Sequence, residues 1–310
     1  MKILLTGGAG FVGFHLSRAL SRRGHEVFIA DRAAVQELGR THLVMQLENA
    51  ESIAAAVQSV RPECIIHLAA QSSVSASWKD PESTLETNIL GSVRLFQAMI
   101  RIVPDCRFVF IGSGEEYGTN CSEDRLFTEG SECRPCNLYA VSKLSAGRIL
   151  ELLALRHSAR LVHLRPFNHF GPRQREGFVI ADFCAQIARS EKDKGGRTIY
   201  TGNLSAKRDF LYIDDVVRAY CLVAEAENWS HPVYNISTGT VHPVQSILDF
   251  LVSQAKVPLR VEIDPARFRP VEVPVLCAAS RLMEQDFGWK PEFTLEEGLL
   301  RNLNWWREQV

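Results

Sequence analysis

The sequence of 310 residues lacks an excess of charge of either sign, because 35 Lys and Arg nearly balance 36 Asp and Glu, for a net charge of −1. A chain without a strongly basic balance gives no electrostatic reason to bind nucleic acid or an anionic membrane. It also has no apolar run close to the roughly 20 residues of a membrane-spanning helix. We therefore expect neither nucleic acid nor membrane as a partner, and local arginines must hold any anionic ligand.

The sequence also lacks a recognisable leader segment, internal repeat, low-complexity tract or flexible linker. It begins MKILLTGG, which is typical of a first strand and leaves no room for a cleaved signal. Eight cysteines are scattered, and Cys64 and Cys106 fall in or beside expected buried strands, which indicates reduced thiols in a cytoplasmic protein. Cys133 and Cys136 form a single CxxC, with Cys121 upstream. A zinc or redox site needs more ligands or a suitable helix start, so we expect loop residues and no metal.

Short apolar runs alternate with amphipathic segments through the first half of the chain. The runs KILLT, EVFIA, HLVM, CIIHLA, RFVFIG and ARLVHLRP are typical of buried strands. The longest helices of this half are expected at about 81–102 and 137–157. The alternation predicts an α/β fold built on a doubly wound parallel sheet, a Rossmann architecture.

Beyond Pro166 the pattern loosens, with short strands expected around RTIYTG, RDFLYI and PVYNIS. Helices are expected to start near Asp214, Val244, Ser280 and Thr294. We predict a dinucleotide-binding domain over 1–166 and a mainly substrate-binding lobe over 167–310, with segments that return to the sheet. Trp305 and Trp306 are expected to pack a C-terminal helix.

The string TGGAGFVG follows the first strand and opens the first helix. Its Gly7, Gly10 and Gly13 have the spacing that lets the backbone approach a pyrophosphate at a helix N-terminus. Asp31 ends the second strand, and this context makes the signal for a dinucleotide strong. Asp31 accepting from the ribose hydroxyls favours NAD, whereas Arg32 pairing with a 2′-phosphate favours NADP, and the sequence leaves both open.

The string YAVSK places Tyr139 and Lys143 four residues apart, hence on one face of a helix. Hydride addition to a ketone creates an alkoxide that must be protonated. A phenol, whose ordinary pKa is about 10, serves this purpose better beside an ammonium that lowers its pKa. Ser113 lies at the carboxyl end of the preceding strand, where open α/β sheets place ligands, so its hydroxyl is expected to bond the substrate oxygen.

The glycine turn, HLAAQSSV, Ser113 and the Tyr139/Lys143 pair together resemble the extended short-chain dehydrogenase/reductase family, whose members modify nucleotide sugars. The resemblance runs essentially from end to end. It implies that Tyr139 is the acid/base, that Lys143 lowers its pKa and holds the nicotinamide ribose, and that Ser113 polarises the carbonyl. It implies NAD or NADP as cofactor, with NADPH slightly favoured. Further expected cofactor contacts are Phe11, Val12, Gln46, Leu47, Leu68, Ala69, Ala70 and Pro166, with Gln46 standing where the family usually has an aspartate.

The second half supplies the residues that the resemblance assigns to the sugar nucleotide. Guanidinium groups suit bidentate phosphate recognition, so Arg208 of AKRDF and Arg269 of RFRPVEVP are the expected phosphate ligands. The alternative for Arg208 is an ion pair with Asp209 or Asp214. The other expected substrate contacts are Ser73, Glu115, Asn168 and Val179, while His169 has no assigned role.

Within the family, FNHFGP…GFV, GNLSAKRDF and RFRPVEVPVL look most like the GDP-4-dehydro-6-deoxy-mannose reductases. This implies NAD(P)H-dependent reduction of a GDP-linked 4-keto-6-deoxyhexose to GDP-rhamnose or a related GDP-6-deoxyhexose. The alternative is a GDP-mannose 4,6-dehydratase, or another nucleotide-sugar dehydratase or epimerase, with Glu115 of GSGEEYG as a candidate catalytic base. A non-catalytic dinucleotide-sensing regulator is more remote, since it would need no Ser113, Tyr139 and Lys143. Family members commonly form homodimers through two long helices, here about 81–102 and 137–157.

Overall fold

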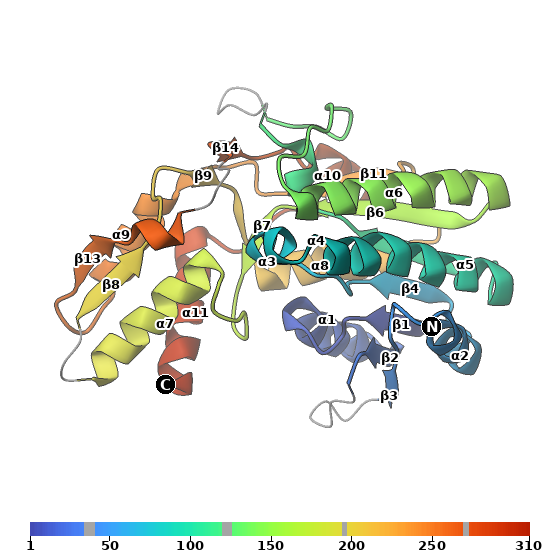
Figure 1. Cartoon of the computed structure of the whole chain (residues 1–310), viewed down its shortest axis with the longest axis horizontal. Coiled ribbons are helices and arrows are strands. Elements are labelled where there is room, and N and C mark those ends of the chain that lie inside the picture. The colour runs from blue at the N-terminus through green and yellow to red at the C-terminus, as the bar shows by residue number, and fades with distance from the viewer. Residues whose placement is uncertain (34–40, 120–125, 194–196, 269–272) are drawn as a thin grey trace.

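The computed structural model describes residues 1–33, 41–119, 126–193, 197–268 and 273–310 (Figure 1). Its centre is a seven-stranded parallel sheet in the order β11-β6-β5-β4-β1-β2-β3. The strands are β1 (Lys2–Thr6), β2 (Glu26–Asp31), β3 (Thr41–Val44), β4 (Cys64–His67), β5 (Arg107–Ile111), β6 (Arg160–Pro166) and β11 (Val233–Ile236). The predicted fold class is confirmed, and the first six strands lie within two residues of their expected bounds.

Apolar side chains on successive strand residues point to opposite faces of the sheet and build two cores. Ile3 and Leu5 of β1 face one core, which includes residues of α1 (Phe11–Arg22) and α8 (Ile213–Glu225). Leu4 faces the other core, formed with α2 (Ala50–Val60), α5 (Ser92–Ile102) and α6 (Leu138–His157). The sheet is therefore covered by helices on both faces, and α5 and α6 run side by side across one of them (Figure 1).

The helix expected over 137–157 is α6, but the one expected over 81–102 is interrupted. It consists of α4 (Pro81–Leu85), a π-helical segment η2 (Glu86–Gly91) and α5, preceded by the short α3 (Val74–Lys79). The π segment carries Asn88, which is buried. Its Nδ2 donates to Ser142 Oγ of α6 over 2.9 Å, and its Oδ1 accepts from Gln71 N over 2.8 Å. The irregular turn therefore joins three segments beside the site.

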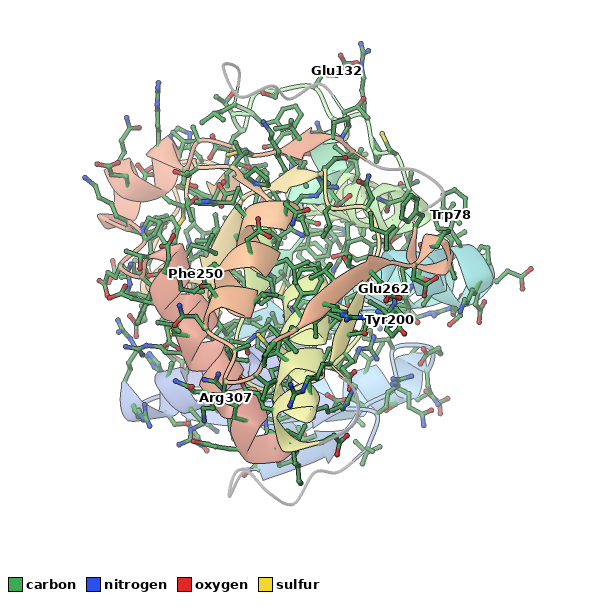
Figure 2. The ribbon with its side chains drawn as sticks, turned by 90° about the vertical axis from the view of Figure 1, so that its left-hand side faces the viewer. Trp78, Glu132, Tyr200, Phe250, Glu262 and Arg307 are labelled. Atoms are coloured by element: carbon green, nitrogen blue, oxygen red, sulfur yellow. The ribbon has the colours of Figure 1, made fainter. Side chains whose placement is uncertain are left out.

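The second half contributes a smaller lobe, which faces the viewer in Figure 2 with Tyr200, Phe250, Glu262 and Arg307 labelled. The helix starts predicted near Asp214, Val244, Ser280 and Thr294 are confirmed in α8, α9 (Val244–Ser253), α10 (Arg281–Phe287) and α11 (Leu295–Gln309). The sequence did not predict α7 (Val179–Lys192). Besides β6 and β11 of the main sheet, the described strands beyond β5 are β7 (Asn168–Phe170), β8 (Thr198–Thr201), β9 (Lys207–Arg208), β10 (Phe210–Tyr212), β12 (His242–Pro243), β13 (Arg260–Ile263) and β14 (Val275–Leu276).

The second half also returns to the main sheet, because β11 pairs in parallel with β6 and the Phe167 N–H donates to Ile236 O over 2.9 Å. Helix α8 then packs against α1. The division into domains at Pro166 stays a prediction. Among the described residues, no helix has both the length and the apolar character that crossing a membrane requires.

Candidate active site

The order of the sheet creates a topological switch point between β1 and β4. Chain connections run outward in opposite directions from β1 and β4, and ligands of open α/β sheets bind at the carboxyl ends of strands at such a switch point. The segments that leave these ends are the glycine turn after β1, residues 68–70 after β4, Ser113 after β5 and Asn168 after β6. The fold thus gathers most of the predicted site residues at the carboxyl ends of these strands.

The turn between β1 and α1 requires glycine at two positions. Gly7 has a φ of +68°, and a Cβ on it would lie 2.8 Å from Ala69 Cα in the loop after β4. A Cβ on Gly13 would lie 2.5 Å from Gly7 O. Gly10 is the N-cap of α1 and provides no side-chain cap, so the first N–H groups of the helix, near Phe11 and Val12, are available to an anion. This cradle fits the pyrophosphate of a dinucleotide.

The residues expected around the adenosine lie at the ends of β2 and β3. Asp31 accepts from Ala9 N over 3.2 Å and from Arg32 N over 2.8 Å, while the Arg32 side chain is exposed. Gln46 is exposed, and its N–H donates to Ser52 Oγ over 3.2 Å. Leu47 is buried against Gly91 of the π segment. None of these contacts distinguishes a ribose hydroxyl from a 2′-phosphate, so the choice between NAD and NADP stays open.

Behind the loop after β4 lies a buried hydrogen-bonded chain that the sequence did not predict. His67 Nδ1 lies 2.7 Å from Thr6 Oγ1, and His67 Nε2 lies 2.9 Å from Ser92 Oγ. Thr6 Oγ1 accepts from Ala69 N over 3.2 Å. Burial, with a smaller contribution from the positive charge of Lys143, lowers the pKa of His67 to about 3. The neutral ring therefore fixes the loop that carries Leu68, Ala69 and Ala70; the signal in the sequence was a histidine inside the apolar run CIIHLA.

Ser113 and Tyr139, which are 26 positions apart in the sequence, bring their hydroxyl groups close enough to interact. Ser113 follows β5 and is the N-cap of η3 (Gly114–Tyr117), a 3-10 turn. Tyr139 stands in the first turn of α6, whose N-cap Asn137 accepts from Ala140 N over 2.8 Å. Burial raises the pKa of the Tyr139 phenol, the nearby Ser113 hydroxyl opposes this, and the charges of Glu115 and Glu116 raise it further.

Lys143 lies one turn beyond Tyr139 and is 3% exposed. Its Nζ donates to Ile111 O over 2.7 Å and stands 5.1 Å from the centre of the Phe110 ring. Burial lowers the pKa of Lys143 to about 8, against the opposing charge of Glu116. The ammonium bonds to the β5 backbone, and the lowering of the Tyr139 pKa by Lys143 stays a prediction. The phenol is accordingly protonated at neutral pH, as a proton donor must be.

The two carboxylates of GSGEEYG have different surroundings. Glu115 is half-buried, and its Oε2 accepts from Asn137 Nδ2 over 3.0 Å beside Tyr139. Glu116 is fully buried and accepts from Arg165 Nε over 2.8 Å. The sequence analysis assigned no role to Glu116. The sequence signal that could have found it is the pair of polar residues, His163 and Arg165, within the strand RLVHLRP, because buried polar side chains need a partner.

Residues expected at the substrate occupy three different elements. Asn168 begins β7, and its buried Oδ1 has no hydrogen-bond partner among the described residues, so it can accept from a ligand. Ser73 caps α3, its Oγ accepting from Ala76 N over 3.2 Å, and Val179 begins α7. His169 stacks on Phe11 with ring centres 6.1 Å apart, and burial lowers its pKa. It supports the start of α1 from the second half of the chain.

Arg208 is buried on β9, and its Nη1 donates to Lys207 O over 2.9 Å. The neighbouring Asp209 accepts from Ser237 Oγ and from the backbone N–H groups of Thr238 and Gly239, so its carboxylate organises that loop. Arg269 and Cys121 lie outside the described residues. Cys133 and Cys136 are partly buried free thiols. The roles assigned to all these residues stay predictions.

Comparisons with known proteins agree with this geometry. The family model described as GDP-mannose 4,6 dehydratase matches residues 4–301. A GDP-6-deoxy-D-mannose reductase of Pseudomonas aeruginosa is 31% identical over 310 residues, covering 100% of this chain and 98% of the relative. A structure of RMD from Pseudomonas aeruginosa complexed with NADPH matches with a TM-score of 0.88 at 30% identity, covering 100% and 99% of the two chains. The Thermus thermophilus UDP-glucose 4-epimerase complexed with NAD matches with a TM-score of 0.89 at 29% identity, covering 100% of both chains. The chain belongs to the GDP-mannose 4,6-dehydratase family, within the extended short-chain dehydrogenases/reductases that act on nucleotide sugars with NAD(P).

Proposed function

We propose that this enzyme reduces the 4-keto group of a GDP-linked 4-keto-6-deoxyhexose, giving GDP-rhamnose or a related GDP-6-deoxyhexose. The observation that carries the proposal is the proximity of the Ser113 hydroxyl to the protonated phenol of Tyr139 at the carboxyl end of β5. Two hydroxyl donors at one point suit a carbonyl oxygen that becomes an alkoxide. The 31% identity to a GDP-6-deoxy-D-mannose reductase over the whole chain supports the choice of substrate.

In this proposal NADPH or NADH supplies the hydride when it is bound in the cradle after β1. Ser113 Oγ donates a hydrogen bond to the 4-keto oxygen and so fixes its position. Tyr139 donates its phenolic proton to the same oxygen as negative charge develops there. Lys143 holds the ribose next to the nicotinamide. A catalytically silent regulator would not need these three residues assembled, and this argues against that alternative.

Cofactor preference belongs to the same proposal. The exposed Arg32 after β2 suits a 2′-phosphate, and a neighbouring structure was solved with NADPH, so we favour NADPH. Arg32→Ala should then raise KM for NADPH about tenfold and leave KM for NADH unchanged, since one charged hydrogen bond contributes about 1.5–3 kcal/mol. Equal effects on both cofactors would show that Arg32 does not recognise the 2′-phosphate.

The GDP-sugar is proposed to lie between the two lobes, its diphosphate on Arg208 and Arg269. Asn168, with its unpaired buried oxygen, contacts the sugar nucleotide, as do Ser73, Glu115 and Val179. The scattered free cysteines support a cytoplasmic location. We keep the division into a cofactor domain over 1–166 and a mainly substrate-binding lobe over 167–310.

A homodimer through the two long helical regions is also part of the proposal. Leu85, Leu90, Val141, Ile149, Leu152 and Leu155 are exposed apolar side chains of α4, η2 and α6. Leu152 and Leu155 are 68% and 73% exposed, which is unusual for leucine on a helix of this size. Light scattering at micromolar concentration should give a dimer for the wild type and a monomer for Leu152→Glu/Leu155→Glu. A monomeric wild type would contradict this part of the proposal.

Dehydration of GDP-mannose is the second candidate, because Glu115 is partly buried beside Tyr139 where a base at C5 would have to act. Incubation of the pure protein distinguishes the reactions. A reductase oxidises added NADPH or NADH only in the presence of the 4-keto sugar. A dehydratase makes that 4-keto sugar from GDP-mannose with no net consumption of cofactor, and a 4-epimerase interconverts two nucleotide sugars.

A further inference from the structure

A buried ionic cluster lies directly behind Ser113. Glu116 Oε1 accepts from the Ser113 backbone N–H over 2.9 Å and from His163 Nε2 over 3.0 Å. Glu116 Oε2 accepts from Arg165 Nε over 2.8 Å. His163 and Arg165 are two positions apart on β6, so both side chains lie on the same face of the sheet. The Glu116 cluster, as we call Glu116, His163 and Arg165, therefore connects the central sheet to the catalytic turn.

Glycines on two separate elements make room for the cluster. A Cβ on Gly112, between β5 and Ser113, would collide with both His163 Nε2 and Glu116 Oε1. A Cβ on Gly147 of α6 would lie 2.6 Å from His163 Cε1. A side chain at either position would displace the imidazole from the carboxylate. The local sequence thus accommodates an ion pair at a place where an apolar residue would be simpler to bury.

Glu116 is the ionised carboxylate of the cluster. Burial raises the pKa of Glu116, but His163, Arg165 and the Ser113 N–H together hold that pKa below its usual range. Arg165 also donates to Tyr117 Oη over 3.0 Å, and Tyr117 Oη donates to Asn235 Oδ1 over 2.7 Å. The carboxylate is thus ionised and well fixed, although it is fully buried.

The charge of the Glu116 carboxylate acts on the buried ammonium of Lys143. Lys143 is faced by Glu116 from η3, by His67 from β4 and by the Phe110 ring from β5. Burial lowers the pKa of His67 to about 3, so this ring is neutral at physiological pH. The charge of Glu116 raises the pKa of Lys143 and opposes the effect of burial.

We propose that Glu116 is a positioning residue, which fixes Ser113 through its backbone N–H and supplies the opposing charge for the buried Lys143 ammonium. The inference rests on the proposed function only in placing Ser113 and Lys143 in a ketoreductase site. It also separates the two carboxylates of GSGEEYG: Glu115 faces the substrate region, whereas Glu116 acts from behind the turn and touches no substrate.

Titration of Lys143 tests this without any substrate. The full chain is labelled with 13C-lysine, and the Lys143 side-chain signal is assigned by its loss in Lys143→Arg. Glu116→Gln should lower the pH at which this signal titrates by about one pH unit, because it removes the charge that opposes the effect of burial on Lys143. Glu116→Asp keeps the charge and should return the titration toward that of the wild type. A folded Glu116→Gln protein with an unchanged Lys143 titration overturns the proposal.

Glu116→Gln leaves Arg165 without its carboxylate, so the variant can lose its fold. Glu116→Gln/Arg165→Met removes both charges and provides a second route to the same titration. Tyr117→Phe is the matched control: its ring stays stacked on Phe127, with centres 4.7 Å apart, and it loses only the hydroxyl that contacts Arg165 and Asn235. We expect Tyr117→Phe to lower the melting temperature and to leave the Lys143 titration unchanged. If Tyr117→Phe shifts the Lys143 titration as much as Glu116→Gln does, the shift reflects a general loss of packing, and the proposal is overturned.

Kinetics supply the second measurement. With the 4-keto sugar, Glu116→Gln should lower kcat at least tenfold with less than threefold change in KM for the cofactor, and the alkaline fall of kcat should move to lower pH with Lys143. A wild-type protein that does not reduce the 4-keto sugar defeats the proposed function but not this inference, which the titration decides alone. A wild-type reductase whose Glu116→Gln variant keeps kcat and its pH profile defeats the inference but not the proposed function.

Discussion

Replacing Lys143 with methionine removes a buried ammonium, and the stability effect should depend on pH in a calculable way. Burial lowers the pKa of Lys143 from its ordinary 10.5 to about 8. Between these two values the unfolded chain binds more protons than the folded one, so the wild-type free energy of unfolding rises with pH across this window. At about 1.36 kcal/mol per pH unit, the lowered pKa of Lys143 reduces the free energy of unfolding by about 3 kcal/mol at pH 7 and by about 1.4 kcal/mol at pH 9.5.

The assay is urea unfolding of the wild type and Lys143→Met at pH 7 and pH 9.5, followed by tryptophan fluorescence. Methionine keeps the apolar contact with Phe110 and loses the hydrogen bond to Ile111 O. The loss of this hydrogen bond changes the free energy of unfolding by about the same amount at both pH values. The wild type should therefore gain about 2 kcal/mol relative to the variant between pH 7 and pH 9.5. If the difference in the free energy of unfolding between the two proteins does not change with pH, the inference that burial lowers the pKa of Lys143 is wrong.

Three further substitutions test individual parts of the site. Tyr139→Phe should lower kcat by roughly 10²–10⁴-fold with little change in cofactor affinity, since it removes the proton donor; near-wild-type turnover would exclude that role. Gly13→Ala should weaken NADPH binding at least tenfold in a fluorescence titration, because its Cβ would lie 2.5 Å from Gly7 O and displace the turn; unchanged binding would place the cofactor elsewhere. Arg208→Ala should raise KM for the GDP-sugar roughly 10–100-fold, the equivalent of about 1.5–3 kcal/mol for a charged hydrogen bond, whereas a lower melting temperature with an unchanged KM would indicate a structural arginine.

The sheet and the positions of the reactive side chains could be predicted because their signals are local. Each strand of the first half is a short apolar run, and Ser113, Tyr139 and Lys143 stand at fixed places relative to a strand end and a helix start. The interrupted helix over 81–102 could not be predicted in the same way. Its π-helical turn is associated with the side chain of Asn88, which is held by Gln71 and Ser142 from other segments.

The electrostatics of the site could not be predicted from spacing alone. The i, i+4 spacing places Lys143 beside Tyr139, yet the ammonium bonds to Ile111 O, and burial raises the pKa of the phenol. Glu116 and His163 are 47 positions apart, so only the packed fold brings them within 3.0 Å. The strands of two residues, such as β9 and β12, likewise depend on partners distant in the sequence.

Transfer of deuterium from the cofactor to the sugar tests the central claim most directly. The pure protein is incubated with the GDP-linked 4-keto-6-deoxyhexose and NADPH or NADH deuterated on the transferred face of C4, and the product is examined by mass spectrometry and NMR. The account predicts one deuterium at C4 of a GDP-6-deoxyhexose for each cofactor oxidised. Formation of the 4-keto sugar from GDP-mannose without consumption of cofactor, with solvent hydrogen entering C5, would contradict it and assign the enzyme to dehydration.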